Sequence, residues 1–180
     1  RWIRLLYCYP DAVTDELLDV MAREKKIVKY MDLPLQHCSQ RVLRAMRRAG
    51  SREELTALIR KMRERVPGLV LRTTMIAGFP GETQEDFDEL CEFAKEIGFE
   101  RLGCFAYSQE EGTPAGEMDG QLPKEEKERR RDVLMEQQSI TMQRWGESRI
   151  GQTVEVLVEG FDRYAECWFG RSAADAPDGD

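Results

Sequence analysis

The sequence is poor in the residues on which metal centres and hydrolytic triads depend. Its 180 residues include one histidine, His37, and five cysteines, none at the short mutual spacings of iron–sulfur or zinc motifs. No Gly-x-Ser-x-Gly motif is present, which excludes the nucleophile elbow of the α/β hydrolases. The odd number and wide spacing of the cysteines argue against a secreted disulfide framework. They favour a reducing, cytoplasmic location.

Long apolar runs and an excess of positive charge are missing as well. No apolar stretch approaches membrane-spanning length, so we expect no membrane partner. The net charge of −7 disfavours a sequence-independent grip on nucleic acid phosphates. The chain starts inside a strand pattern, residues 1–9, and stops on turn residues, 176–180. We therefore expect a fragment of a longer protein.

Strand and helix patterns alternate through the first two thirds of the chain. Strands are predicted at residues 2–9, 27–35, 69–76 and 101–107. The helices between them have N-cap candidates at Thr14, Ser39, Ser51 and Thr83. This order predicts an α/β fold with parallel strands and right-handed crossovers, in a barrel or an open sheet. Loops 8–10, 36–38, 77–82 and 107–110 should then converge at the carboxyl ends of the strands.

The last third of the chain differs in character. Pro123 opens a long charged helix that should run to about Trp145, with its charge run 124–131 as a solvated face. The expected inner side is Val133, Leu134, Ile140, Thr141 and Trp145. An alternating strand at 153–159, a turn at 160–162 and a returning strand at 166–171 then predict the start of a small all-β module. The predicted domains are residues 1–149 and 150–180.

The stretch 69–86 is the centre of the functional prediction. A strand runs into the turn Gly78-Phe79-Pro80-Gly81, and Thr83 with Asp86 forms a capping-box pair at the next helix. Backbone N–H groups that point outward from such a turn suit an anionic or polar ligand. The alternative is a plain βα corner.

Arg72 lies inside an apolar strand and needs a charged partner, for which Asp32 and Glu82 are candidates. It forms either a plain ion pair or a ligand contact. Adjacent residues rarely face one ion, so His37 and Cys38 suit the core better than a metal.

Three aromatic residues are either core residues or stacking partners of a ligand base: Phe79, Phe105 and Tyr107.

Four segments resemble the radical S-adenosylmethionine methylthiotransferases: residues 33–37, 43–46, 72–83, and 105–108 with 111–113. The part from Gly151 onward resembles the opening of the TRAM module that follows the barrel in this family. Its tail, 170–172 and 175–179, is similar to the RimO-type branch, which modifies an aspartate of a small-subunit ribosomal protein, protein twelve. The tail is less similar to the MiaB-type branch, which modifies adenosine in tRNA.

The resemblance implies a partial parallel (β/α) barrel and S-adenosylmethionine as cofactor. It also implies a reductant protein and two 4Fe-4S clusters in the full-length protein, whose ligands are absent from these residues. One cluster would cleave the cofactor to a radical that takes hydrogen from the aspartate β-carbon, and the other would supply the sulfur. By position, Gln36 and Arg72 would contact polar groups of S-adenosylmethionine. Gly78, Phe79, Phe105 and Tyr107 would lie around its nucleoside.

The charge of the last segment favours the ribosomal-protein branch. Residues 151–180 hold seven acidic and two basic side chains, a net −5. An acidic module suits a basic ribosomal protein and repels tRNA. Two alternatives stay open: a tRNA-modifying enzyme, and a barrel that serves only as a docking module.

Overall fold

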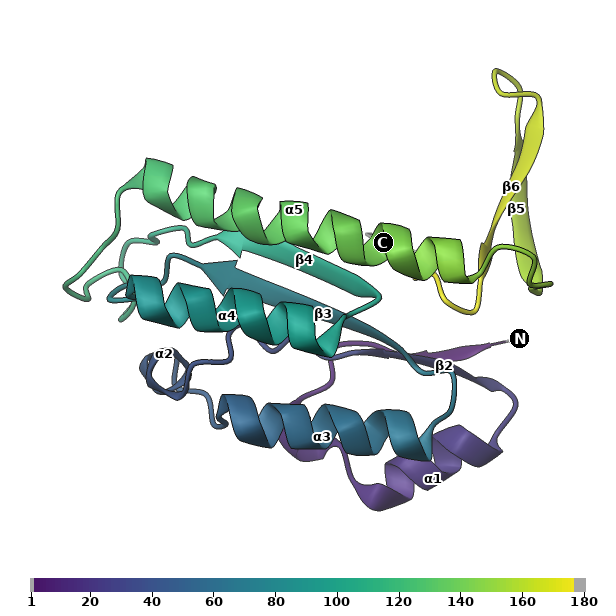
Figure 1. Ribbon diagram of the computed structural model, residues 1–180, viewed down its shortest axis with the longest axis horizontal. Coiled ribbons are helices and arrows are strands. Elements are labelled where there is room, and N and C mark those ends of the chain that lie inside the picture. Colours follow the sequence, from purple (N-terminus) through teal and green to yellow (C-terminus); the bar gives the residue numbers. More distant parts are fainter. Residues whose placement is uncertain (1, 177–180) are drawn as a thin grey trace.

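A four-stranded parallel sheet, in the order β1-β2-β3-β4, forms the centre of the computed structural model, which describes residues 2–176 (Figure 1). The strands are β1 (Ile3–Leu5), β2 (Ile27–Asp32), β3 (Val70–Ala77) and β4 (Arg101–Ala106). The helices are η1 (Pro10–Ala12), α1 (Asp15–Arg23), α2 (Gln40–Ala45), α3 (Arg52–Arg65), α4 (Gln84–Ile97) and α5 (Lys124–Ser148). The predicted parallel α/β alternation is confirmed.

The predicted helix starts are correct, and three of the four N-caps act as expected. Thr14, Ser51 and Thr83 each accept a hydrogen bond from a backbone N–H of the first turn. Thr83 and Asp86 complete a reciprocal capping box. Ser39 differs, because its hydroxyl donates to Asp86 Oδ1 at 2.7 Å instead of capping its own helix.

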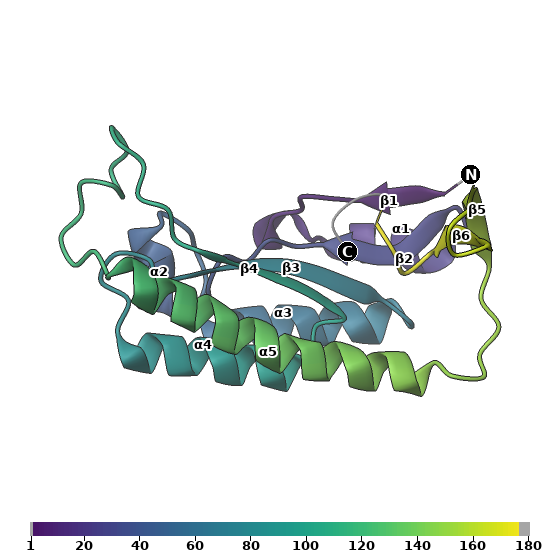
Figure 2. The same ribbon diagram turned by 90° about the horizontal axis from the view of Figure 1, so that it is seen from above.

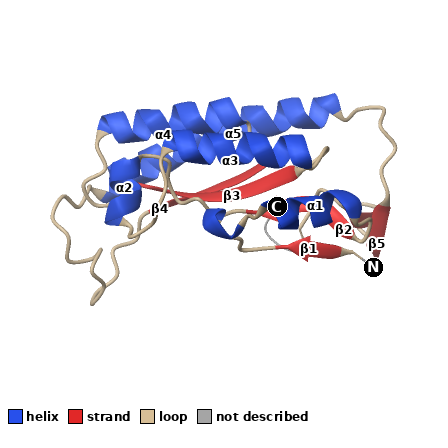
Figure 3. Ribbon diagram, turned by 90° about the horizontal axis from the view of Figure 1, so that it is seen from below, coloured by secondary structure: helices blue, strands red, loops and turns tan. Residues whose placement is uncertain are grey.

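The two faces of the sheet have different surroundings. Helices α3, α4 and α5 lie on one side of β3 and β4 (Figures 2 and 3). Alternate residues of β3, such as Leu71 and Met75, are buried on this side in the main core. Arg72, Thr74 and Ile76 point to the other side and stay partly exposed. This open face is what the inner wall of a partial barrel would present.

Two strands are shorter than predicted. β1 covers residues 3–5 instead of 2–9, because Tyr7 adopts a left-handed φ of 56° and its N–H donates to Asp32 Oδ2. β2 ends at Asp32 instead of Leu35, in keeping with Pro34, which has no N–H to donate. Gln36 then rejoins the sheet through an isolated bridge to Met75.

An antiparallel hairpin, β5 (Val156–Asp162) and β6 (Cys167–Ser172), stands at the end of the sheet opposite α2 (Figure 1). The predicted turn at 160–162 is wrong, because these residues continue β5. The turn follows at Asp162, whose Oδ1 accepts from the N–H groups of Tyr164 and Ala165. The predicted boundary at 149/150 stays a prediction. Residues 177–179 of the RimO-type tail lie outside the described residues.

The segment after β6 returns to the sheet. Ala174 and Ala176 pack with Val28, Tyr30 and Val70 in a second, smaller core. Within residues 2–176, no helix has both the length and the hydrophobicity that crossing a bilayer requires.

Candidate functional site at the carboxyl ends of the strands

A cavity of about 650 Å³ lies where the segments after β2 and β3 meet, and we call it the rim cavity. It is lined by Gln36, Ala45, Met46, Arg47, Arg48, Ile76, Phe79 and residues 113–115 and 118. This volume falls in the range of small-molecule sites. The predicted convergence of loops 36–38 and 77–82 is therefore confirmed. Tyr9, from loop 8–10, lines an adjacent cavity of about 710 Å³ that shares Met46, Arg47 and Arg48.

Gln36 is held in an unusual backbone conformation. Its φ is 71°, a left-handed value that is uncommon for a residue other than glycine. Hydrogen bonds to β3 hold it there: its N–H donates to the Thr74 carbonyl at 2.9 Å, and its carbonyl accepts from Ile76 N at 2.8 Å. Such conformations cluster at functional sites, where surrounding bonds compensate the strain.

The turn 78–82 uses its glycines as predicted. Gly78 and Gly81 have φ values of 78° and 76°. A Cβ on Gly78 would lie 2.6 Å from Lys127 Cγ, so the position also lacks space. The Gly78 N–H donates to Glu82 Oε2 at 2.9 Å.

Two of the three candidate aromatic residues form a pair. The rings of Phe79 and Tyr107 meet edge to face, with centroids 5.2 Å apart. Phe79 is buried and still lines the rim cavity, whereas Phe105 is 63% exposed. Their contact with a nucleoside stays a prediction.

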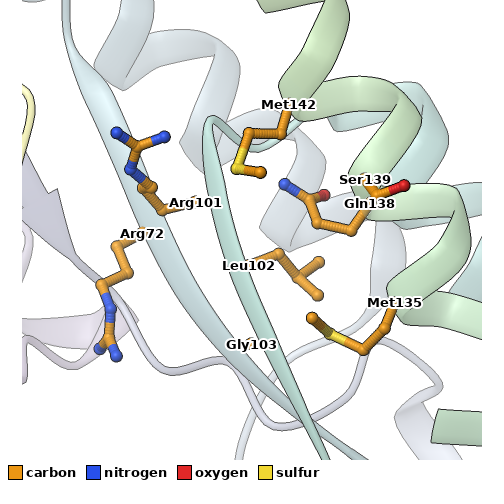
Figure 4. A pocket seen from close by; sticks show the side chains of 8 residues that line it. All are labelled: Arg72, Arg101, Leu102, Gly103, Met135, Gln138, Ser139 and Met142. Atoms are coloured by element: carbon orange, nitrogen blue, oxygen red, sulfur yellow. The ribbon is translucent and has the colours of Figure 1, made fainter. Parts of the chain in front are cut away.

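Arg72 pairs with Asp32, one of its two predicted partners, through Nη1 and Oδ1 at 3.2 Å. It borders a different cavity, of about 270 Å³, together with Arg101 and residues of α5 (Figure 4). Figure 4 shows both arginines directed away from the α5 side chains Met135 and Met142. Arg72 lies three residues before Met75, the bridge partner of Gln36, which is about 10 Å along a strand. The structure thus does not bring Arg72 to the rim cavity, and its cofactor contact stays a prediction.

His37 and Cys38 face different partners. His37 is fully buried, its Nδ1 accepts from Ser39 N at 3.0 Å, and its Nε2 lies 3.4 Å from Glu82 Oε2. Cys38 belongs to the main core, where burial raises the pKa of its thiol. Across residues 2–176, no group of three or more histidine, cysteine or acidic side chains lies close enough to hold a metal ion.

Two residues of α5 that contact the turn 78–82 were not predicted from the sequence. Lys127 and Arg130 belong to the charge run that was expected to be solvated, yet both are buried beside the turn 78–82. The expected inner residues Val133 and Ile140 are instead exposed. The signal was the spacing: Lys127 and Arg130 continue, at steps of three and four, the stripe of Leu134, Gln138, Thr141 and Trp145.

Comparisons with known proteins place this geometry in a family. The family model of the Radical SAM superfamily matches residues 1–94. The chain belongs to this superfamily. It is 52% identical over 178 residues to ribosomal protein uS12 methylthiotransferase RimO of Pelotomaculum thermopropionicum, covering 98% of this chain and 40% of that protein. It is 51% identical to the protein of the same name from Desulfitobacterium hafniense, with 99% and 40% covered.

The radical SAM fold is also found among solved structures. Coproporphyrinogen III oxidase (HemN) from Escherichia coli, a radical SAM enzyme, superposes with a TM-score of 0.61. The match covers 79% of this chain and 32% of HemN at 23% identity. It confirms the predicted partial barrel and carries no further information on function. The chain spans about 40% of the length of its methylthiotransferase relatives.

The superfamily implies S-adenosylmethionine and a 4Fe-4S cluster, and the described residues fit them differently. The rim cavity offers an amide, guanidinium groups and an aromatic edge, which suit a charged nucleoside. A cluster does not fit, since residues 2–176 bring no such ligand group together. Burial raises the pKa of the Cys104 thiol to about 12. This thiol is therefore protonated at neutral pH, whereas iron requires a thiolate.

Proposed function

We propose that this chain supplies the later strands of the barrel of a radical SAM methylthiotransferase. The complete protein would transfer a methylthio group to the β-carbon of an aspartate in ribosomal protein uS12. One observation supports this most: about half of the residues are identical, over nearly the whole chain, to proteins named as uS12 methylthiotransferases.

The chain's own residues would bind and orient S-adenosylmethionine in the rim cavity. Gln36 would offer its side-chain amide from a rigid backbone, and Phe79 an edge for the adenine ring. Arg47 and Arg48, at the end of α2, could pair with the cofactor carboxylate. Bound S-adenosylmethionine would serve as the source of the radical that abstracts hydrogen. The iron–sulfur clusters would be held by residues outside 2–176.

The proposed partners follow from charge and from the reaction. The net −5 of residues 151–180 suits a basic ribosomal protein better than tRNA. A reductant protein would provide the electrons, in a reducing cytoplasm.

The test uses the complete gene product, with clusters reconstituted under anaerobic conditions. It is incubated with S-adenosylmethionine, a reductant, a sulfur source and either purified uS12 or unmodified tRNA. Mass spectrometry should find a methylthio group on the aspartate of uS12. Modification of tRNA adenosine alone would instead support the MiaB-type alternative. Cofactor binding without modification of either substrate would favour the docking module.

A further inference from the structure

The first turns of α5 pack against the turn that carries Gly78 and Phe79. The side chain of Arg130 is 6% exposed, and its Nη1 donates to Glu82 Oε1 at 2.7 Å. The same nitrogen lies 3.1 Å from the Glu82 carbonyl oxygen and 3.2 Å from that of Thr83. Arg130 Nε donates to Glu126 Oε1 at 2.7 Å, which orients the guanidinium. One side chain of α5 thus binds both the carboxylate and the carbonyls of the turn.

The second carboxylate oxygen of Glu82 contacts the start of the turn. Its side chain is fully buried, and the oxygen that Arg130 does not contact accepts the Gly78 N–H. That oxygen also faces His37 Nε2 at 3.4 Å. Nδ1 of His37 accepts from Ser39 N, and within residues 2–176 its buried Nε2 has no hydrogen-bond partner. The carboxylate therefore connects α5 to the turn, and it lies close to His37 in the segment after β2.

Lys127 adds a second contact from the same helix face. Its stem lies under Gly78, where an added Cβ would be 3.1 Å from Lys127 Cα. Its ammonium lies 4.9 Å from the ring centroid of Tyr107, which in turn packs on Phe79. The buried face of α5 therefore reaches the turn and the aromatic pair.

We propose that Arg130 is a positioning residue for the rim cavity. Its guanidinium binds the turn 78–82 to α5 and so holds the turn in its ligand-binding conformation. The proposal deepens the proposed function and rests on it, because the ligand is taken to be S-adenosylmethionine. A turn with two glycines at positive φ has other conformations available once the Glu82 carboxylate loses its contact with Arg130. Displacement of Gly78 and Phe79 by about 1 Å would be enough to impair binding.

The effect of losing Arg130 should be local, because α5 has other attachments. Leu134 is fully buried in the main core. Gln138 donates to the Phe99 carbonyl at 2.9 Å. These contacts keep the helix on the sheet when the turn loses its arginine.

The experiment compares R130M with R129M in the complete protein. Arg129 is the matched control, because it is exposed and its hydrogen bonds go to Glu126 and Gln84. Calorimetry measures the affinity for S-adenosylhomocysteine, and hydrogen exchange measures protection of residues 78–83. R130M should weaken binding by about 10- to 100-fold and speed exchange in the turn. R129M should behave as the unmodified protein does.

R130K and E82Q keep the proposal testable if R130M does not fold. R130K retains the charge without the planar fork and should be intermediate in both readouts. Unchanged exchange at 78–83 in R130K and E82Q, or equal affinity in R130M and R129M, would overturn the proposal. Because the exchange measurement needs no ligand, it decides the role of Arg130 even if the protein does not bind S-adenosylhomocysteine. Absence of binding in the unmodified protein would refute the proposed function instead.

Discussion

The two ends of the sheet differ in which side chains they bury and which they expose. At the rim, buried charged groups are paired: Glu82 with Arg130, and Asp86 with Arg41 and Ser39. At the other end, the hairpin exposes large apolar side chains, among them Trp168 at 71% and Phe169 at 53%. An isolated two-stranded hairpin is marginally stable in water. The stability of the hairpin therefore depends on its contacts with the sheet, whereas the rim depends on ion pairs and hydrogen bonds between buried groups.

The largest effect should come from Glu82→Ala, which breaks the rim network. Removing the Glu82 carboxylate breaks the buried ion pair, leaves Arg130 with Glu126 as its carboxylate partner and takes the acceptor from the Gly78 N–H, which should cost about 3–5 kcal/mol of folding free energy. Urea unfolding at neutral pH measures it. Glu85→Ala is the control, since Glu85 is exposed in the first turn of α4, the helix that follows Glu82. An equal loss in both variants would mean that the network does not stabilise the rim.

Arg72→Ala tests whether Arg72, in the middle of the open face of the sheet, contacts the cofactor as the residues of the rim cavity are proposed to do. The change deprives Asp32, which is buried, of its ion pair and should cost about 1–3 kcal/mol. If Arg72 contacts the cofactor, the affinity for S-adenosylhomocysteine in the complete protein should fall as well. Calorimetry under conditions where both proteins are folded separates the two effects. Unchanged affinity rejects the cofactor assignment of Arg72.

Asp86→Asn probes the pH dependence of the rim. Burial alone would raise the pKa of this carboxyl, but hydrogen bonds from Ser39, Thr83 and Arg41 outweigh it and hold the pKa well below 3.8. A lowered folded pKa means that the stabilisation is present above the unfolded pKa and is lost as pH falls below it.

The variant should lose about 1–2 kcal/mol at neutral pH. Its stability should also fall less steeply than that of the unmodified chain below pH 3.8. Urea midpoints measured from neutral to acidic pH check this. Parallel curves for the two proteins would contradict the assignment.

Asp175→Asn loosens the other end. Asp175 Oδ1 accepts from Arg101 Nη2 at 2.7 Å, and Oδ2 accepts from Ser172 N and Oγ. The pair is partly exposed, so we expect a loss of about 1 kcal/mol or less. Proteolysis and hydrogen exchange should speed up in residues 153–176 and stay unchanged at 78–83. Asp132→Asn, at an exposed ion pair, is the control. Faster exchange at the rim would show that the two ends are coupled.

Phe105→Ser should have the smallest effect on stability, within about 0.5 kcal/mol, because the ring is mainly in solvent. Any loss of S-adenosylhomocysteine affinity in this variant would then report a direct contact. Calorimetry on the complete protein measures it. Full affinity would remove Phe105 from the nucleoside candidates.

Local chemistry was sufficient to predict the alternation of strands and helices, the caps at Thr14, Ser51 and Thr83, and the glycine turn. Each of these features depends on residues within a few positions along the chain. The hydrophobic period sets the element type, a hydroxyl caps the helix, and a glycine allows the positive φ of the turn. Gly160 predicts the hairpin turn too early, since β5 continues through it to Asp162. The side chain of Asp162 satisfies the backbone two and three residues further on.

Long-range pairing determined the rest, because a side chain's partner across the fold does not show in its neighbours. Charged runs on helices are usually solvated, which places Lys127 and Arg130 in solvent. The carboxylate and carbonyls of the turn instead provide the partners that a buried guanidinium requires. Ser39 likewise binds a distant partner, since its hydroxyl donates to Asp86 instead of capping α2. The amino-acid order thus prescribed the elements and the turn, and three-dimensional packing selected which charges leave water to hold that turn in place.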